Sequence, residues 1–194
     1  MTKLTDLTKI KESNGKIFDF KDVIESIENH KVLPFNNQSL LDLFKQAAQN
    51  TITTINSAPL FKGRPNEFGN LVQWNFEKEC VNLGMDYHSP TDASGRVKTS
   101  GYPDGFINFN NYLSYVEIKT FDFSKKRQTL RSFFYSPSRS SKIIHDASHL
   151  LIGFATQNLK LVDFHITDMY VKKVILKLEF NQNNKEIYKE DEEI

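Results

Sequence analysis

The chain has 194 residues, of which 25% are charged, with a formal net charge of +1 and one cysteine. This composition predicts a globular protein with one hydrophobic core, and it excludes the disordered, fibrous and disulfide-stabilised classes. The longest apolar run, residues 150–155, is too short to cross a bilayer, and the start of the chain shows no secretory signal. We therefore expect one domain over residues 1–194, without a membrane partner, in the cytoplasm of a bacterial cell.

The first 60 residues predict a helical N-terminal region. Apolar residues recur at helical spacing over residues 20–27 and again over residues 40–55. Ser39 and Asp42 form a Ser-x-x-Asp pattern, which predicts the cap of the second helix. The apolar stripe of that helix is interpreted as core packing, with a dimer contact as the alternative.

A third helix is expected from Pro65 to about Gly84, at the start of a catalytic core over residues 65–180. Cys80 lies in its apolar pattern and is interpreted as a small buried hydrophobic residue rather than a nucleophile.

From residue 85 onward the period of the pattern changes from helical to strand-like. A polar loop over 87–99 is followed by expected strands over 102–109, 113–121, 149–156, 161–167 and 171–180, a short helix over 140–148, and an acidic tail over 185–194. This order predicts an α/β fold with a central mixed sheet flanked by helices.

Asn110-Asn111 separates the first two strands and predicts a two-residue hairpin turn, because asparagine tolerates positive φ. With that turn, Asp104 faces Glu117 across the hairpin, and Lys119 points to the same side as Glu117. Opposed carboxylates destabilise a sheet unless a cation lies between them. Mg²⁺ is suited to this position because it binds carboxylates, water and phosphate.

Gly-Tyr-Pro103-Asp104-Gly followed by Val116-Glu117-Ile118-Lys119 resembles the PD-(D/E)xK signature of the restriction-endonuclease-like nuclease superfamily. The resemblance implies that Asp104 and Glu117 bind Mg²⁺, that the backbone carbonyl of Ile118 also faces the metal, and that Lys119 assists the attacking water. It also implies a restriction-endonuclease-like core.

Many members of the superfamily place a further glutamate on the helix before the hairpin. Glu77 is our candidate for this metal contact, with Glu67 and Gln73 as rivals. A solvated helix face is an equally good interpretation of each of these residues.

A basic stretch follows the strand expected over 113–121, because residues 125–145 contain lysines and arginines but no acid. Such a stretch indicates either a polyanion partner or a solvated surface loop. The candidate DNA-binding residues, taken from this stretch and from the loop 89–99, are Arg96, Lys98, Lys125, Lys126, Arg127, Gln128, Arg131, Ser136, Ser138, Arg139 and Lys142. Phe133, Phe134 and Tyr135 are expected to anchor the loop in the core.

His145 and His149 are four residues apart and could share a helix face as metal ligands. We favour a structural role for both, because no further ligand pattern accompanies them. The chain also has no Gly-rich phosphate loop and no Gly-x-Ser-x-Gly elbow.

Within the superfamily the resemblance is to type II restriction endonucleases. It implies a homodimer that cuts both strands of a short duplex DNA sequence, leaves a 5′-phosphate, and is paired with a methyltransferase that protects the same site. The alternatives are a repair or junction-resolving nuclease of the same superfamily and a non-catalytic DNA-binding protein.

Overall fold

The computed structural model describes residues 11–125, 133–179 and 181. The described residues fall into two compact units, a larger one within Asp19–Lys172 and a smaller one made from the described residues before Asp19 and after Lys172. The smaller unit carries a two-stranded sheet in which β1 (Ile17–Asp19) pairs with β8 (Lys173–Ile175). The organisation as a single domain stays a prediction, and the acidic tail lies outside the described residues.

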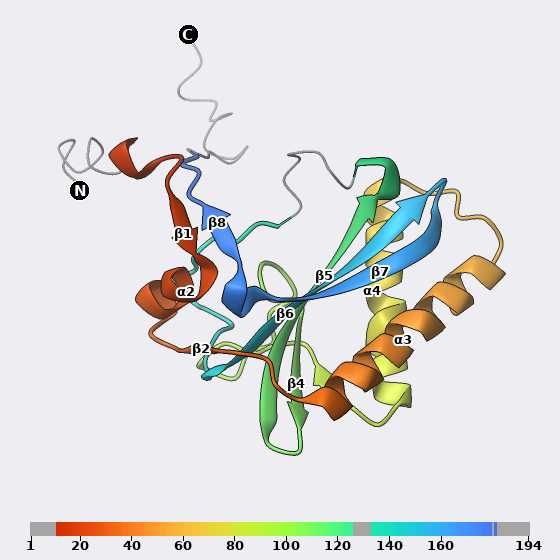
Figure 1. The fold of residues 1–194 in the computed structure, drawn as a ribbon, viewed down its shortest axis with the longest axis horizontal. Coiled ribbons are helices and arrows are strands. Elements are labelled where there is room, and N and C mark those ends of the chain that lie inside the picture. Colours follow the sequence, from red (N-terminus) through yellow and green to blue (C-terminus); the bar gives the residue numbers. More distant parts are fainter. Residues whose placement is uncertain (1–10, 126–132, 180, 182–194) are drawn as a thin grey trace, which may run out of the picture. The chain divides into compact units, whose positions relative to one another are not determined.

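The larger unit is built on a six-stranded mixed sheet (Figure 1). Its strands are β2 (Val32–Leu33), β3 (Asp86–His88), β4 (Gly105–Phe109), β5 (Tyr112–Asp122), β6 (Ala147–Gln157) and β7 (Lys160–Asp168). The order is β2-β6-β5-β4-β3, and β7 also pairs with β6. Parallel pairing of β6 with β5 and β2, beside antiparallel hairpins, makes the sheet mixed. The predicted α/β class with a central mixed sheet is confirmed.

Three α-helices precede the β4–β5 hairpin in the larger unit. They are α2 (Phe20–Glu28), α3 (Gln38–Ser57) and α4 (Pro65–Asn82), close to the ranges that the periodicity predicts. Phe44 of α3 stacks on Phe76 of α4, which in turn contacts Phe154 of β6. The apolar stripe of α3 is therefore part of the core, as expected, and Cys80 is buried in the same cluster.

The cap of α3 differs from the prediction. The N-cap residue is Asn37, whose side-chain oxygen accepts a hydrogen bond from the backbone N–H of Leu40 at 3.0 Å. Ser39 lies inside the first turn, and Asp42 instead accepts hydrogen bonds from Gln38 and Lys45. The predicted Ser39–Asp42 cap is therefore wrong, because the helix begins two positions earlier, at an asparagine whose side chain accepts from a free N–H of the first turn.

The helix predicted over residues 140–148 is also wrong. Residues 140–146 are irregular and β6 begins at Ala147. Serine side chains compete here for the local hydrogen bonds, since Ser141 Oγ accepts from the backbone N–H of Ile143. The tertiary contacts of Ser140 and Lys142, described below, also draw this segment away from a helical path.

Two further boundaries differ from the expectation. The polar loop loses its first residues to β3, which pairs with β4, and it contains an isolated bridge between Thr91 and Val97. The strand expected over 171–180 is reduced to β8, because the 3-10 helix η2 (Met169–Val171) precedes it. Asp168 stabilises η2 by accepting from the backbone N–H of Tyr170. A second 3-10 helix, η1 (Phe123–Lys125), ends β5.

Candidate active site

The β4–β5 hairpin carries the candidate catalytic residues. Asn110 and Asn111 form its turn with φ of 52° and 64°, and Phe109 pairs with Tyr112. The pairing of Gly105 with Val116 confirms the register that this turn predicts. Since β5 lies between β4 and β6, the residues that it presents are held by a central strand.

Asp104 lies just outside the paired ladder, because β4 begins at Gly105 rather than at Tyr102 as expected. Its Oδ2 accepts a hydrogen bond of 2.8 Å from the backbone N–H of Ile118. Asp104 and Glu117 therefore do not form the directly opposed pair in the ladder that the turn predicts. Their side chains still converge. Lys119 Nζ lies 2.6 Å from Glu117 Oε1 and 3.7 Å from Asp104 Oδ2.

Glu117 is a buried carboxyl group, with 3% of the residue exposed. Burial, followed by the negative charge of Asp104, raises the pKa of Glu117 to about 7, although Lys119 acts in the opposite direction. Within the described part of the chain, Glu117 Oε2 has no hydrogen-bond partner. A buried carboxylate oxygen without a partner is costly, so a cation with oxygen preference would stabilise the charged form of Glu117.

Lys119 shows that these oxygen atoms can surround one cation. Its Nζ contacts both carboxylates and also donates to the backbone carbonyl of Ile118 at 3.2 Å. Burial lowers the pKa of Lys119, but Glu117 and Asp104 outweigh it and the pKa is raised. The three groups that the resemblance assigns to the metal therefore bind one ammonium group in this structure.

Glu77, the candidate for a further metal contact, lies on α4. It is held by Gln73, whose Nε2 donates to Glu77 Oε1 at 3.0 Å. Burial raises the pKa of Glu77 and the charge of Asp104 raises it further, against the effect of Gln73. Glu67 is instead engaged at the N-terminus of α4, where its carboxylate accepts from the backbone N–H and Nε of Arg64.

Across residues 11–125, 133–179 and 181, no group of three or more His, Cys, Asp and Glu side chains could hold a metal ion. The candidate site has two carboxylates and a backbone carbonyl, which is a usual protein contribution to Mg²⁺ because water and phosphate supply the other ligands. The role of Glu77 as a further ligand stays a prediction.

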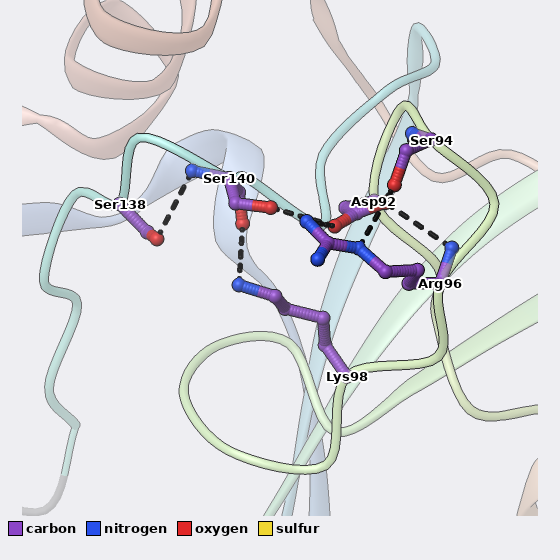
Figure 2. Close-up of polar contacts among 6 residues, drawn as sticks. All are labelled: Asp92, Ser94, Arg96, Lys98, Ser138 and Ser140. Carbon is purple, nitrogen blue, oxygen red and sulfur yellow. Dashed lines mark hydrogen bonds and ion pairs between the residues drawn. The ribbon is translucent and has the colours of Figure 1, made fainter.

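A second polar cluster joins the loop 89–99 to the segment that precedes β6 (Figure 2). At its centre is Asp92, which is 2% exposed. Asp92 Oδ1 accepts from Ser94 Oγ at 2.5 Å, and Oδ2 accepts from Ser140 Oγ at 2.6 Å and lies 3.3 Å from Arg96 Nη2. The hydroxyls of Ser140 and Ser94 lower the pKa of Asp92 below its usual range.

Lys98 makes a second link between these two segments, because its Nζ donates to the Ser140 carbonyl at 3.2 Å. Ser138 Oγ accepts from the backbone N–H of Ser140 and orders the same segment. The side chain of Arg96 stays 75% exposed. Two segments that are far apart in the sequence therefore present their candidate DNA-binding residues together.

The other candidate DNA-binding residues have mixed positions. Lys126, Arg127, Gln128 and Arg131 lie outside the described residues. Ser136 and Arg139 are exposed, and Lys125 is exposed beside Asp122, with 3.7 Å between Nζ and Oδ2. Lys142 is 4% exposed, so its ammonium group faces the protein interior and not a surface that DNA could reach.

Aromatic residues anchor part of the basic stretch. Phe133 packs edge-on against Phe20 and Tyr102, and Tyr135 Oη donates to Glu28 Oε1. Phe134 differs from the expectation, because it is 51% exposed.

His145 and His149 do not share a helix. His149 is completely buried in β6, where its Nδ1 is hydrogen-bonded to Tyr102 Oη at 2.6 Å. Burial lowers the pKa of His149 to about 3, so the ring is neutral. His145 stacks on Phe106, with 5.4 Å between the ring centroids. Both rings therefore take part in packing, as expected.

Two residues near the site were not predicted from the sequence. Asp92 follows a recognisable local pattern, Asp-x-Ser, in which an aspartate side chain accepts from an N–H two residues later. Gly105 permits close packing of Tyr87, because a Cβ atom there would lie 2.0 Å from Tyr87 Oη. That requirement depends on a tertiary contact and leaves no pattern in the sequence.

The mixed sheet with flanking helices, together with two carboxylates and a lysine on one hairpin, defines a nuclease of the restriction-endonuclease-like class. The model of the type II restriction enzyme MjaV family matches residues 12–191. The chain is also similar to the type II restriction enzyme MjaV of Methanocaldococcus jannaschii, with 28% identity over 197 residues that cover 89% of this chain and 85% of the relative. This chain belongs to the type II restriction enzyme MjaV family and is a type II restriction endonuclease.

Family membership sets aside the repair nuclease and the non-catalytic DNA-binding protein as interpretations. It implies double-stranded DNA as the substrate, and type II restriction enzymes generally use Mg²⁺. No solved structure matches the chain. In the described ranges, no helix is long and apolar enough to cross a membrane.

Proposed function

We propose that Asp104, Glu117 and Lys119 form the catalytic centre and that the chain uses Mg²⁺ to hydrolyse both strands of a short duplex DNA sequence. The observation that carries the proposal is the convergence of two carboxylates and the Ile118 carbonyl on the single ammonium group of Lys119. Oxygen atoms that surround one cation in this way are suited to hold another.

Asp104, Glu117 and the carbonyl of Ile118 are the residues that would hold Mg²⁺. The unpartnered Oε2 atom of Glu117 supports this assignment, because the buried oxygen lacks the interaction that a hard cation supplies. Mg²⁺, when bound, polarises the phosphodiester and neutralises charge on the leaving oxygen. Glu77 does not group with Asp104 and Glu117 around one point in the described residues, so its contact with the metal would run through water.

Lys119 supplies positive charge beside the phosphate that is cut. Its raised pKa keeps the ammonium charged at neutral pH, so it can donate to the attacking water or to a phosphate oxygen. A donor fixed on a central strand needs little reorganisation as negative charge develops in the transition state.

We assign DNA binding to two parts of the chain. One is the surface formed by the loop 89–99 and the segment before β6, which Asp92 links through Ser140. The other is the basic stretch that follows β5. Arg96 and Arg139 are exposed on this surface. Arginine can neutralise phosphate and can also pair with guanine in the major groove. Further polar contacts come from Lys98, Lys125, Ser136 and Ser138. We keep as candidates the other predicted residues of the basic stretch except Lys142, namely Lys126, Arg127, Gln128 and Arg131.

The biological assembly is proposed to be a homodimer with a two-fold axis, which would read a palindromic site. The helical region before Pro65 is the candidate dimer contact. A methyltransferase that modifies the same sequence is the expected functional partner, because the host's own DNA would otherwise be cut. We expect the enzyme to act in the cytoplasm, where incoming DNA is encountered.

The test is digestion of unmethylated phage DNA by the full chain with Mg²⁺, with EDTA as the control. Discrete, reproducible bands are expected. Asp104→Asn should abolish cutting, whereas Asp163→Asn, which changes a partly exposed carboxyl on β7, should not. Cutting limited to branched or mismatched DNA, or no Mg²⁺-dependent cutting of any DNA, would contradict the proposal.

A further inference from the structure

Lys142 is a buried lysine in the irregular segment that precedes β6, and it is 4% exposed. Burying an ammonium group is costly unless its hydrogen bonds are satisfied. Its Nζ donates to the backbone carbonyl of Gly101 at 2.5 Å and to the backbone carbonyl of Pro103. The lysine is therefore committed to one short piece of backbone.

That piece of backbone leads directly to Asp104. The carbonyl of Pro103 belongs to the peptide unit that also contains the nitrogen and Cα of Asp104, and this unit is planar. Holding the Pro103 oxygen therefore fixes the plane from which Asp104 projects. A second hydrogen bond, to the carbonyl of Gly101, holds the backbone two residues earlier.

The other end of Asp104 is held as well. Its Oδ2 accepts from the backbone N–H of Ile118, and no strand pairing restrains Asp104 because β4 begins one residue later. Lys142 thus replaces the restraint that a ladder would supply. Its charge is also attracted by Asp104 and Glu117, which are both candidate metal ligands.

The segment that carries Lys142 also holds the loop 89–99. Ser140, two residues before Lys142, accepts from Lys98 through its carbonyl and donates to Asp92 through its hydroxyl (Figure 2). One short segment therefore contacts both the proposed DNA-binding surface and the backbone before Asp104.

We propose that Lys142 is a positioning residue that sets Asp104 for metal binding, rather than a DNA contact as its place in the basic stretch predicts. The proposal rests on the assignment of Asp104 as a metal ligand. A residue that orients a ligand in this way usually changes metal affinity or activity by about 10- to 100-fold when it is removed.

The experiment compares wild-type protein with Lys142→Met in three measurements. The first is Mn²⁺ affinity by calorimetry without DNA, since Mn²⁺ takes the same oxygen ligands as Mg²⁺. The second is hydrogen exchange of the Ile118 amide, which reports on its bond to Asp104. The third is the affinity for DNA in EDTA and its dependence on salt.

For Lys142→Met we expect Mn²⁺ affinity to fall at least tenfold and the Ile118 amide to exchange faster, while DNA affinity and its salt dependence stay unchanged. Lys160→Met removes an exposed lysine on β7, and Thr51→Val removes a buried hydroxyl in α3. Both controls should keep wild-type Mn²⁺ affinity. Asp104→Asn should lose Mn²⁺ affinity as Lys142→Met does, and the double variant should lose little more.

Unchanged Mn²⁺ affinity and Ile118 exchange in folded Lys142→Met would overturn the inference. So would a loss confined to DNA affinity with a shallower salt dependence, which would make Lys142 a phosphate contact. If Lys142→Met does not fold, Lys142→Arg decides, because a guanidinium can donate to both carbonyls. A folded Lys142→Arg protein that loses Ile118 protection but keeps Mn²⁺ affinity would contradict the inference.

The proposed function can fail separately from this inference. In that case the wild-type protein itself would neither bind Mn²⁺ nor cut DNA, whereas exchange at Ile118 would still report whether Lys142 holds Asp104.

Discussion

Replacement of Glu117 by glutamine should make the stability of the protein less dependent on pH in the absence of divalent metal. The pKa of Glu117 is about 7 in the folded protein, above the ordinary value of 4.5, because the group is buried beside Asp104. A group with a raised pKa in the folded state contributes its full stability below pH 4.5. That contribution is lost progressively as the pH rises from 4.5 to about 7, because over this interval the unfolded chain gives up the proton while the folded protein still holds it.

The size of the effect follows from the same two values. A change in pKa from 4.5 to about 7 corresponds to a loss of about 3 kcal/mol in the free energy of unfolding between pH 4 and pH 8. Glutamine carries no titrating proton. The free energy of unfolding of Glu117→Gln should therefore rise relative to that of the wild-type protein by about this amount between pH 4 and pH 8. The difference in the free energy of unfolding between variant and wild type is compared at the two pH values. This comparison cancels effects of the substitution that do not depend on pH.

The assay is urea unfolding of both proteins in EDTA at pH 4 and at pH 8, followed by circular dichroism. Asp163→Asn serves as the control, because Asp163 is a partly exposed residue of β7 and is not one of the candidate site residues, so this variant should follow the wild-type profile. If the difference between Glu117→Gln and wild type varies by less than about 0.5 kcal/mol between the two pH values, the argument from burial is wrong.

Three further outcomes are expected. Asn37→Ala should lower the free energy of unfolding by about 1 kcal/mol, whereas Ser39→Ala should have little effect in the same urea experiment, since Asn37 is the cap of α3. Gly105→Ala should destabilise by about 1–3 kcal/mol, because the new Cβ meets Tyr87, and the loss caused by Gly105→Ala should be smaller when it is measured in a Tyr87→Ala background. Asp92→Asn should weaken DNA binding, measured by anisotropy, and leave Mn²⁺ affinity unchanged, because it loosens only the link between the loop 89–99 and the segment before β6.

The sequence by itself determined the hairpin and most of the residues around it. Asn110-Asn111 sets the turn, and the alternation of residues along a strand then places Glu117 and Lys119 on one side of β5. These are local rules, with a period of two and a turn that tolerates positive φ, so they can be applied without knowledge of the rest of the chain. The helices α2, α3 and α4 were predictable for the same reason.

Only the tertiary structure decided how Asp104 is held and what Lys142 does. The sequence places Asp104 in a strand, but β4 starts one residue later and Asp104 bonds to the Ile118 amide instead. The sequence predicts Lys142 to be one more DNA-binding cation of the basic stretch. In the structure it is buried and donates to the carbonyls of Gly101 and Pro103. Both outcomes depend on contacts between residues far apart in the chain, and the physical reason is that a buried charge must find its partners wherever the fold brings them.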